Sequence, residues 1–227
     1  MFLSEKEAII SDKTMGKHST SIATQIQEHI LAGKPGQVFS PRDFLGLSSR
    51  DAIDHALSRL CGNGSLRKVA RGLYALPQRH PLFGELSVTS DAVARALAGR
   101  DALRLQPAGA YAANQLGLTE QVPMKLLYLT DGPSRLIQVD GREIVLKKTT
   151  PRNMKTAGRI SGTVIQALRW LGKDAVNDQV IDKLRRRLSD SDLAVLRQDA
   201  PLAPAWWITT ALRRVADERL PTTSNCE

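Results

Sequence analysis

Hydroxyl and basic side chains that could contact DNA gather between positions 40 and 71 of this 227-residue chain. Arginine, lysine and histidine donate hydrogen bonds to phosphates and base edges, and serine hydroxyls add further contacts. Their spacing places some at the starts of two short helices and the others in a basic hairpin. The candidate DNA contacts are Ser40, Arg42, Ser48, Ser49, Arg50, His55, Arg59, Arg67, Lys68 and Arg71.

The helix predicted from residue 50 has the pattern of a DNA-recognition helix. In RDAIDHALSRLCG the apolar side chains recur at i, i+3, i+4 and i+7, which predicts one buried stripe. His55 and Arg59 point away from that stripe. Arg50 stands at the helix start, together with the two serines before it, where a recognition helix reaches base edges.

The stretch GSLRKVARGLYALP, residues 64–77, predicts a basic hairpin that follows this helix. Its basic side chains could reach phosphates or an adjacent minor groove, but edge hairpins also carry such charges simply to block aggregation. Val69 falls on the same side as Arg67 and Arg71, so the hairpin requires a bulge, or a partner surface over that side. Tyr74 could donate to a phosphate, although an aromatic strand residue is more often packed against the core.

The order of elements predicts a winged helix-turn-helix over residues 19–77. An amphipathic helix over 19–33 precedes the short strand VFS, a short helix opened by Ser40 and Arg42, the recognition helix and the hairpin. This is the order of a winged helix-turn-helix, in which Ser40 and Arg42 are placed for backbone contacts.

The rest of the chain predicts an α+β protein. Residues 78–87 resemble a linker, and residues 88–220 a mixed α/β domain. Within it, three apolar runs separated by Asp-Gly pairs at 131–132 and 140–141 predict an antiparallel β-meander, and a helical portion follows Pro151. Residues 1–18, which include the alternative start Met15, and residues 221–227 are expected to be tails.

The composition predicts an acidic partner. The net charge is +9 and the sequence pI about 9.9, so nucleic acid is the first candidate and an anionic membrane surface the second. The two cysteines, Cys61 and Cys226, have no metal or redox spacing, which favours a reduced, cytoplasmic protein. No apolar run is long enough to span a membrane, and charged residues near the start argue against a signal peptide.

The sequence offers little for catalysis, so we expect neither an enzyme nor a cofactor or metal. The histidines are dispersed, and no phosphate-binding loop or nucleophile motif is present. Asp131, Glu143 and Lys147 miss the spacing of a metal-dependent nuclease. The arginines at 185–187 fit a solvated helix face, with a second nucleic-acid contact as the alternative. Trp206 and Trp207 point about 100° apart on the last helix, so at most one should be fully buried.

FSPRDFLGLSSRDAIDHALSRLCGNGSLRKVARGLYALP and the later PAGAYAANQLGLTEQVPMKLLYLTDG resemble the AbiEi-like antitoxins of bacterial type IV toxin–antitoxin systems. The resemblance implies a transcriptional repressor that binds inverted repeats in the promoter of its own operon. It also implies an antitoxin that opposes a nucleotidyltransferase toxin without forming a stable complex with it. By matching position, the basic wing and recognition helix of that family correspond to Arg50, Arg59, Arg67, Lys68 and Arg71.

We therefore expect a cytoplasmic DNA-binding repressor and antitoxin. Two alternatives stay open. One is a protein-interaction module in which the winged helix has only a structural role as a scaffold. The other is a nuclease.

Overall fold

The N-terminal part of the chain is a small helical unit on a three-stranded sheet. The computed structural model describes residues 21–82 and 84–217. The sheet order is β1-β3-β2, with antiparallel neighbours. The elements are α1 (Ile22–Leu31), β1 (Val38–Phe39), the 3-10 helix η1 (Pro41–Phe44), α2 (Arg50–Gly62), β2 (Arg67–Ala70) and β3 (Leu73–Ala75).

Local sequence explains where the helices of this N-terminal unit (residues 21–77) begin. Ser21 and Ser49 cap α1 and α2, each accepting a hydrogen bond from a backbone N–H in the first turn. Ser40 and Asp43 form a capping box around η1, a 3-10 helix at the place where a short helix was predicted. The apolar stripe of α2 packs with α1 and Phe44 in one core.

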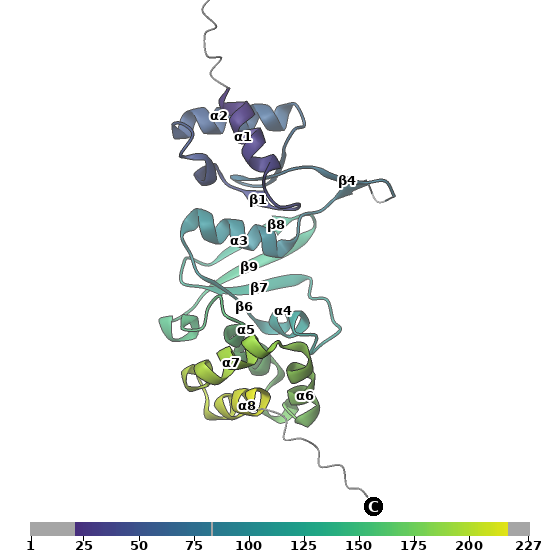
Figure 1. Cartoon of the computed structure of the whole chain (residues 1–227), viewed down its shortest axis with the longest axis vertical. Coiled ribbons are helices and arrows are strands. Elements are labelled where there is room, and N and C mark those ends of the chain that lie inside the picture. Colours follow the sequence, from purple (N-terminus) through teal and green to yellow (C-terminus); the bar gives the residue numbers. More distant parts are fainter. Residues whose placement is uncertain (1–20, 83, 218–227) are drawn as a thin grey trace, which may run out of the picture.

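A second hairpin occupies the segment predicted as a linker. Strands β4 (Gln78–His80) and β5 (Gly84–Leu86) pair antiparallel and project from the side of the molecule (Figure 1). Strands β4 and β5 of this segment therefore form a hairpin. It is also fastened to the N-terminal unit, because Glu85 forms an ion pair with Arg67.

The central sheet is mixed, so the predicted antiparallel meander is wrong. Its order is β6-β7-β9-β8, and β7 runs parallel to β9, with Leu127 opposite Val145. The outer pairs, β6 with β7 and β8 with β9, are antiparallel. The strands are β6 (Leu105–Pro107), β7 (Lys125–Thr130), β8 (Arg135–Val139) and β9 (Arg142–Lys148).

The two Asp-Gly pairs differ in structure, and this difference explains the strand order. Asp140 and Gly141 both have positive φ, as a tight two-residue hairpin turn requires, and they join β8 directly to β9. Asp131 instead accepts hydrogen bonds from the backbone N–H and Nε of Arg104. Gly132 lies against Leu103, so closely that a Cβ would clash. The chain therefore crosses to β8 and leaves room for β9 beside β7.

Helix α3 (Ser90–Asp101) joins the N-terminal unit to the central sheet (Figure 1). One buried cluster contains Val69 and Leu73 from the hairpin β2–β3, Val93 and Leu97 from α3, and Ile144 from the sheet. The N-terminal unit and the central sheet therefore pack against each other through one buried core. A short helix, α4 (Gly109–Gln115), packs on the helices that follow.

The C-terminal part is helical, as predicted, and has its own core. Its one buried carboxylate among the described residues, Asp199, accepts hydrogen bonds from Ser161 Oγ at 2.5 Å and Arg159 Nη1 at 2.7 Å. Trp206 is exposed, whereas Trp207 packs against the core. The elements are η2 (Pro151–Met154), α5 (Ile160–Leu171), η3 (Lys173–Ala175), α6 (Asp178–Arg187), α7 (Asp190–Asp199), η4 (Ala200–Leu202) and α8 (Trp206–Ala216).

Some predictions fall outside the described residues: the tails 1–18 and 221–227, Met15 and Cys226. Within the described ranges, no helix combines the length and the apolar character needed to span a bilayer.

Candidate nucleic-acid interface

A hollow lined by arginines lies where the N-terminal unit meets α3 and β8. Its volume is about 530 Å³. The start of α2 and the β2–β3 turn form one side of it, and the end of α3 and strand β8 form the other. We call it the arginine cleft. Its lining residues are Pro41, Arg50, Ala70, Arg71, Gly72, Leu97, Arg100, Arg135 and Ile137.

Two arginines of the cleft come from the predicted DNA contacts. Arg50 is the first residue of α2, and its Nε forms an exposed ion pair with Asp54 at 2.8 Å. Arg71 lies at the β2–β3 turn, where Gly72 takes the positive φ that the turn requires. The Arg71 side chain is exposed, and its guanidinium has no ion pair with any described residue. Both side chains could therefore turn to an external anion.

The other two arginines share one carboxylate. Asp101 accepts from Arg100 Nε at 2.9 Å and from Arg135 Nη2 at 2.8 Å. Arg100 also donates from Nη1 to the carbonyl oxygen of Arg71 at 2.8 Å. These bonds hold the β2–β3 turn against the end of α3. The hydrogen bonds from the arginines keep the pKa of Asp101 below its usual range.

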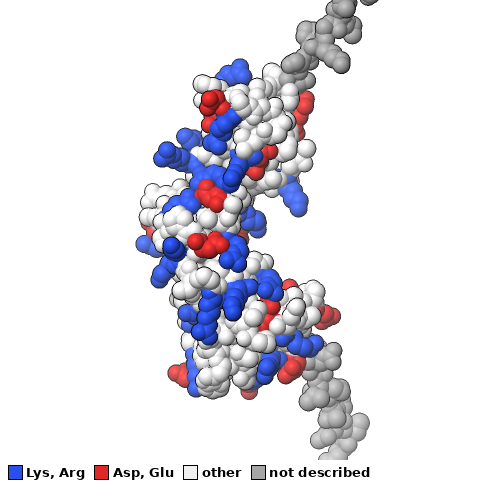
Figure 2. Space-filling view, turned by 90° about the vertical axis from the view of Figure 1, so that its left-hand side faces the viewer, with Lys and Arg blue, Asp and Glu red and all other residues white. Residues whose placement is uncertain are grey.

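The positive charge of the cleft exceeds the negative charge beside it. Four arginines line it, and Arg42 adjoins it by donating from Nη1 to the carbonyl oxygen of Arg100 at 2.6 Å. Asp54 and Asp101 are the carboxylates that pair with the lining arginines. On the face shown in Figure 2, Lys and Arg side chains lie along the whole length of the molecule, with acidic side chains between them.

Arg67, a predicted wing contact, is partly buried and paired with two carboxylates of this chain. Its Nη1 and Nη2 donate to the two carboxylate oxygens of Asp140, at 3.1 and 3.2 Å. Its Nε lies 3.2 Å from Glu85 Oε1, and 23% of the side chain is exposed. Arg67 can contact a phosphate only by breaking these pairs. In this conformation it connects the β2–β3 hairpin to the β8–β9 turn.

The remaining predicted residues divide by exposure. Ser40 is buried, and its hydroxyl donates to Asp43 Oδ2 at 3.1 Å, so in this conformation the hydroxyl is not available for a DNA contact. Ser49 accepts from the backbone N–H of Ala52, so its oxygen serves the helix start. Ser48 is half-buried. The exposed ones are Arg42, Ser49, His55, Arg59 and Lys68.

Two observations explain the unusual side-chain pattern of the hairpin. The pairing of β2 with β3 shifts register between Lys68 and Ala70, which is a bulge. Val69 is buried in the core shared with α3 and the sheet. Both the bulge and the covering surface that Val69 required are therefore present. Tyr74 packs against the core of the N-terminal unit, and burial raises its pKa.

Sequence reasoning missed Arg100 and Arg135. Arg100 stands in the last turn of a helix and Arg135 at the start of a strand, positions where basic residues are common. They lie far in sequence from residue 71, and no local pattern predicts that the three converge. Their role depends on the packing of α3 and β8 against the N-terminal unit.

Residues 25–195 match a family of unknown function, DUF6088. The chain belongs to this family. The match includes both sides of the arginine cleft. The DUF6088 chain is also similar to the crystal structure of the RV2827C protein from Mycobacterium tuberculosis, with 17% identity and a TM-score of 0.42. That alignment covers 88% of this chain and 83% of the other. Comparison with curated proteins finds no match.

The carboxylates considered for a nuclease have basic partners in this DUF6088 protein. Asp131 pairs with Arg104, and Glu143 lies 3.0 Å from Lys125 Nζ. Among residues 21–82 and 84–217, no group of three or more His, Cys, Asp or Glu side chains could hold a metal ion.

We predict that Asp101→Asn lowers the free energy of unfolding at neutral pH by about 1 kcal/mol, because the pairs with Arg100 and Arg135 weaken. Since the pKa of Asp101 is lowered in the folded state, its contribution is present above the unfolded-state pKa. It is lost as the pH falls through the folded-state value. Urea unfolding at several pH values should show the difference from wild type shrinking in acid. The exposed Asp51→Asn is the control, and a difference that did not change with pH would contradict the prediction.

Proposed function

We propose that this chain is a cytoplasmic DNA-binding transcriptional repressor whose N-terminal unit acts as a winged helix-turn-helix. Three features support the proposal. The order α1, β1, η1, α2, β2, β3 with the sheet β1-β3-β2 suits a winged helix. The chain is strongly basic. The exposed start of α2, which would face the major groove, carries Arg50.

The arginine cleft is the observation that carries the proposal. It places Arg50 at the start of α2 beside Arg71 at the hairpin turn, with Arg100 and Arg135 behind them. In a winged helix these two elements face the same stretch of duplex. Arg50 would reach a base edge or a nearby phosphate, and Arg71 a phosphate or the adjacent minor groove. His55 and Arg59 on the exposed side of α2 would extend the contact along the groove.

The resemblance to AbiEi-like antitoxins extends the proposal to a biological role. The chain would bind inverted repeats in its own promoter. It would also oppose a neighbouring nucleotidyltransferase toxin without a stable complex. The second part of the chain would neutralise the toxin or support cooperative binding.

A reporter placed behind the DNA upstream of this gene tests the repressor role. Expression of the chain should lower reporter output, and the double variant Arg50→Ala, Arg71→Ala should restore it. Co-expression with the adjacent reading frame tests the antitoxin role, since the chain should relieve growth arrest caused by that product. Unchanged reporter output with wild-type chain present would refute the repressor role, and unrelieved arrest would refute the antitoxin role.

One observation favours a second candidate, the protein-interaction module. Arg67 of the hairpin is paired with Asp140 and Glu85, and Val69 is buried in the core shared with α3 and the central sheet, so part of the proposed wing serves internal packing. In that reading, removing the exposed charges of the N-terminal unit would leave DNA affinity unchanged.

A further inference from the structure

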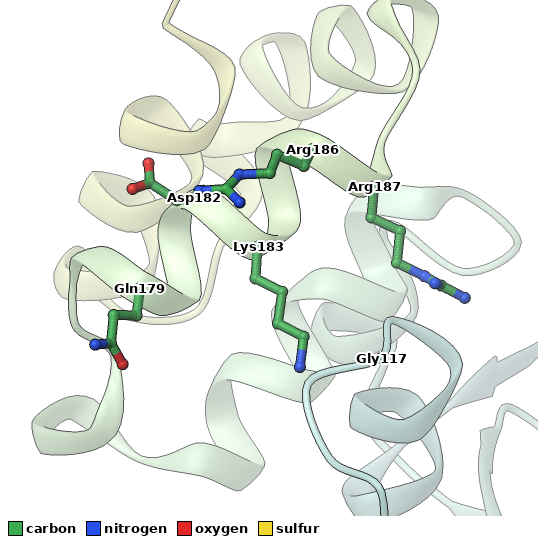
Figure 3. Close-up of a pocket in the computed structure, with 6 residues that line it drawn as sticks. All are labelled: Gly117, Gln179, Asp182, Lys183, Arg186 and Arg187. Carbon is green, nitrogen blue, oxygen red and sulfur yellow. The ribbon is translucent and has the colours of Figure 1, made fainter.

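A second basic hollow lies in the C-terminal part of the chain, between α6 and the turn that follows α4. Its volume is about 600 Å³. We call it the α6 groove (Figure 3). Figure 1 places α6 near the opposite end of the long axis from α2, so this groove is separate from the arginine cleft. Its lining residues are Gly117, Gln179, Asp182, Lys183, Arg186 and Arg187.

Three of the basic residues of α6, Lys183, Arg186 and Arg187, line the groove. Ile181 and Leu184 are buried in the C-terminal core. Gln179, Lys183 and Arg186 recur at i, i+4 and i+7 and therefore share another face. In Figure 3 the Lys183 side chain extends from that face toward the turn at Gly117, and so does that of Arg187.

The basic residues of α6 differ in how many hydrogen bonds and ion pairs they form within the protein. Arg185 donates to Asp182 Oδ1 at 3.3 Å and to carbonyl oxygens of the last turn of α8, so it is a structural residue. Arg187 makes one long bond, 3.4 Å, to the carbonyl oxygen of Gln115. Within the described ranges, Lys183 and Arg186 form no ion pair or hydrogen bond. The carboxylate of the groove is thus already paired, whereas two of its cations are not.

Gly117, on the side of the groove opposite α6, leaves space there because it has no side chain. Its φ is +67°, a conformation that favours glycine, and the Arg187 guanidinium lies 3.5 Å from where a Cβ would stand. A side chain at this position would project into the groove. The attraction of the helix dipole for cations accounts for arginines in the last turn of α6, but Lys183 precedes that turn.

The chemistry of the groove fits phosphate groups. Three cations line a hollow whose volume lies within the usual range of ligand sites; Lys183 and Arg187 extend toward the Gly117 turn, and Arg186 extends toward Asp182. Arginine and lysine together are typical phosphate ligands. None of the lining residues is aromatic, so the groove has no platform for stacking a base. We propose that Lys183, Arg186 and Arg187 bind the phosphate backbone of a nucleic acid without reading its sequence.

This inference deepens the proposed function, because it adds a second contact surface for nucleic acid. Its test uses random-sequence probes and so does not depend on promoter recognition. A phosphate-backbone contact should weaken with rising salt, by a slope of about 0.7 per contact for a single strand and about 0.9 for a duplex.

The test is a fluorescence anisotropy titration of the full chain with a labelled random-sequence RNA strand and a random-sequence DNA duplex. Lys183→Ala with Arg186→Ala should lower affinity about tenfold for at least one probe and reduce the salt slope by about 1.4 to 1.8. The probe affected identifies the strand form that the groove binds. The charge-retaining pair Lys183→Arg with Arg186→Lys should keep most of the affinity.

A matched control removes two exposed charges outside the groove, Arg142→Ala with Lys147→Ala on β9. If this control weakened both probes as much as the groove variant, or if the groove variant weakened neither, the inference would be overturned. Failure of promoter binding by the arginine cleft would leave this result unaffected, so the two proposals can fail separately. Circular dichroism confirms that each variant is folded.

Discussion

Replacing Arg50 and Arg71 together with alanine should lower the affinity of this protein for the duplex upstream of its own gene by about 100-fold. These arginines meet in the arginine cleft, from the start of α2 and from the β2–β3 turn. Neither supports a buried contact through its guanidinium. Arg50 has only an exposed ion pair with Asp54, and Arg71 has none with a described residue. The double substitution should therefore weaken DNA binding without destabilising the fold.

The control for this experiment is Arg142→Ala with Lys147→Ala, which removes the same charge from exposed positions on β9. It should change affinity several-fold less, because long-range attraction between exposed charges is screened by salt. Equal losses in the two double variants would mean that the protein binds DNA through diffuse charge. In that case the arginine cleft would not be the surface that contacts DNA.

Leu73→Ala should lower the free energy of unfolding of the described fold by about 2–5 kcal/mol. Leu73 is fully buried in β3, in the cluster that joins the β2–β3 hairpin to α3 and the central sheet. The shortened side chain would leave a cavity at the junction between the N-terminal unit and the rest. Because the two parts share this core, we expect urea unfolding to remain a single transition that shifts to lower urea.

The comparison variant is Leu136→Ala on β8, whose side chain is largely exposed and should cost less than about 0.5 kcal/mol. A Leu73→Ala variant as stable as Leu136→Ala would show that the shared core does not form. Two separate transitions in the wild-type protein would show the same.

The N-terminal unit was predictable from sequence because its signals are local. Ser49 begins α2, the apolar stripe of that helix is regular, and Gly72 marks the hairpin turn. The α+β class and the helical C-terminal part follow from similar local patterns. The position of Val69 in the alternation also predicted either a bulge or a surface that covers one side of the hairpin, and the structure contains both.

The order of strands in the central sheet was not predictable in the same way. Both Asp-Gly pairs have the composition of a hairpin turn, but only Asp140 and Gly141 adopt it. The pair at 131–132 is held by Arg104 and packed on Leu103, two residues of the loop between α3 and β6. Local turn chemistry cannot distinguish these cases, because the deciding contacts are tertiary.

The sequence also did not predict which charged residues would pair with one another. Arg67 and Asp140 are separated by 73 positions, and their pairing converts a predicted DNA contact into an internal bridge. Arg100 and Arg135 enter the cleft only because α3 and β8 pack against the N-terminal unit. The charge of each residue was evident in the sequence, but its partner was not.

The measurement that tests the central claim most directly is the salt dependence of binding to the upstream duplex. It compares wild type with the Arg50→Ala, Arg71→Ala variant between about 50 and about 200 mM salt. If both arginines contact phosphates, log affinity against log salt should be less steep in the variant by about 1.8. The wild type should also prefer the upstream duplex to a scrambled one. Identical slopes, or no preference for the upstream sequence, would contradict the claim that this cleft is the DNA interface.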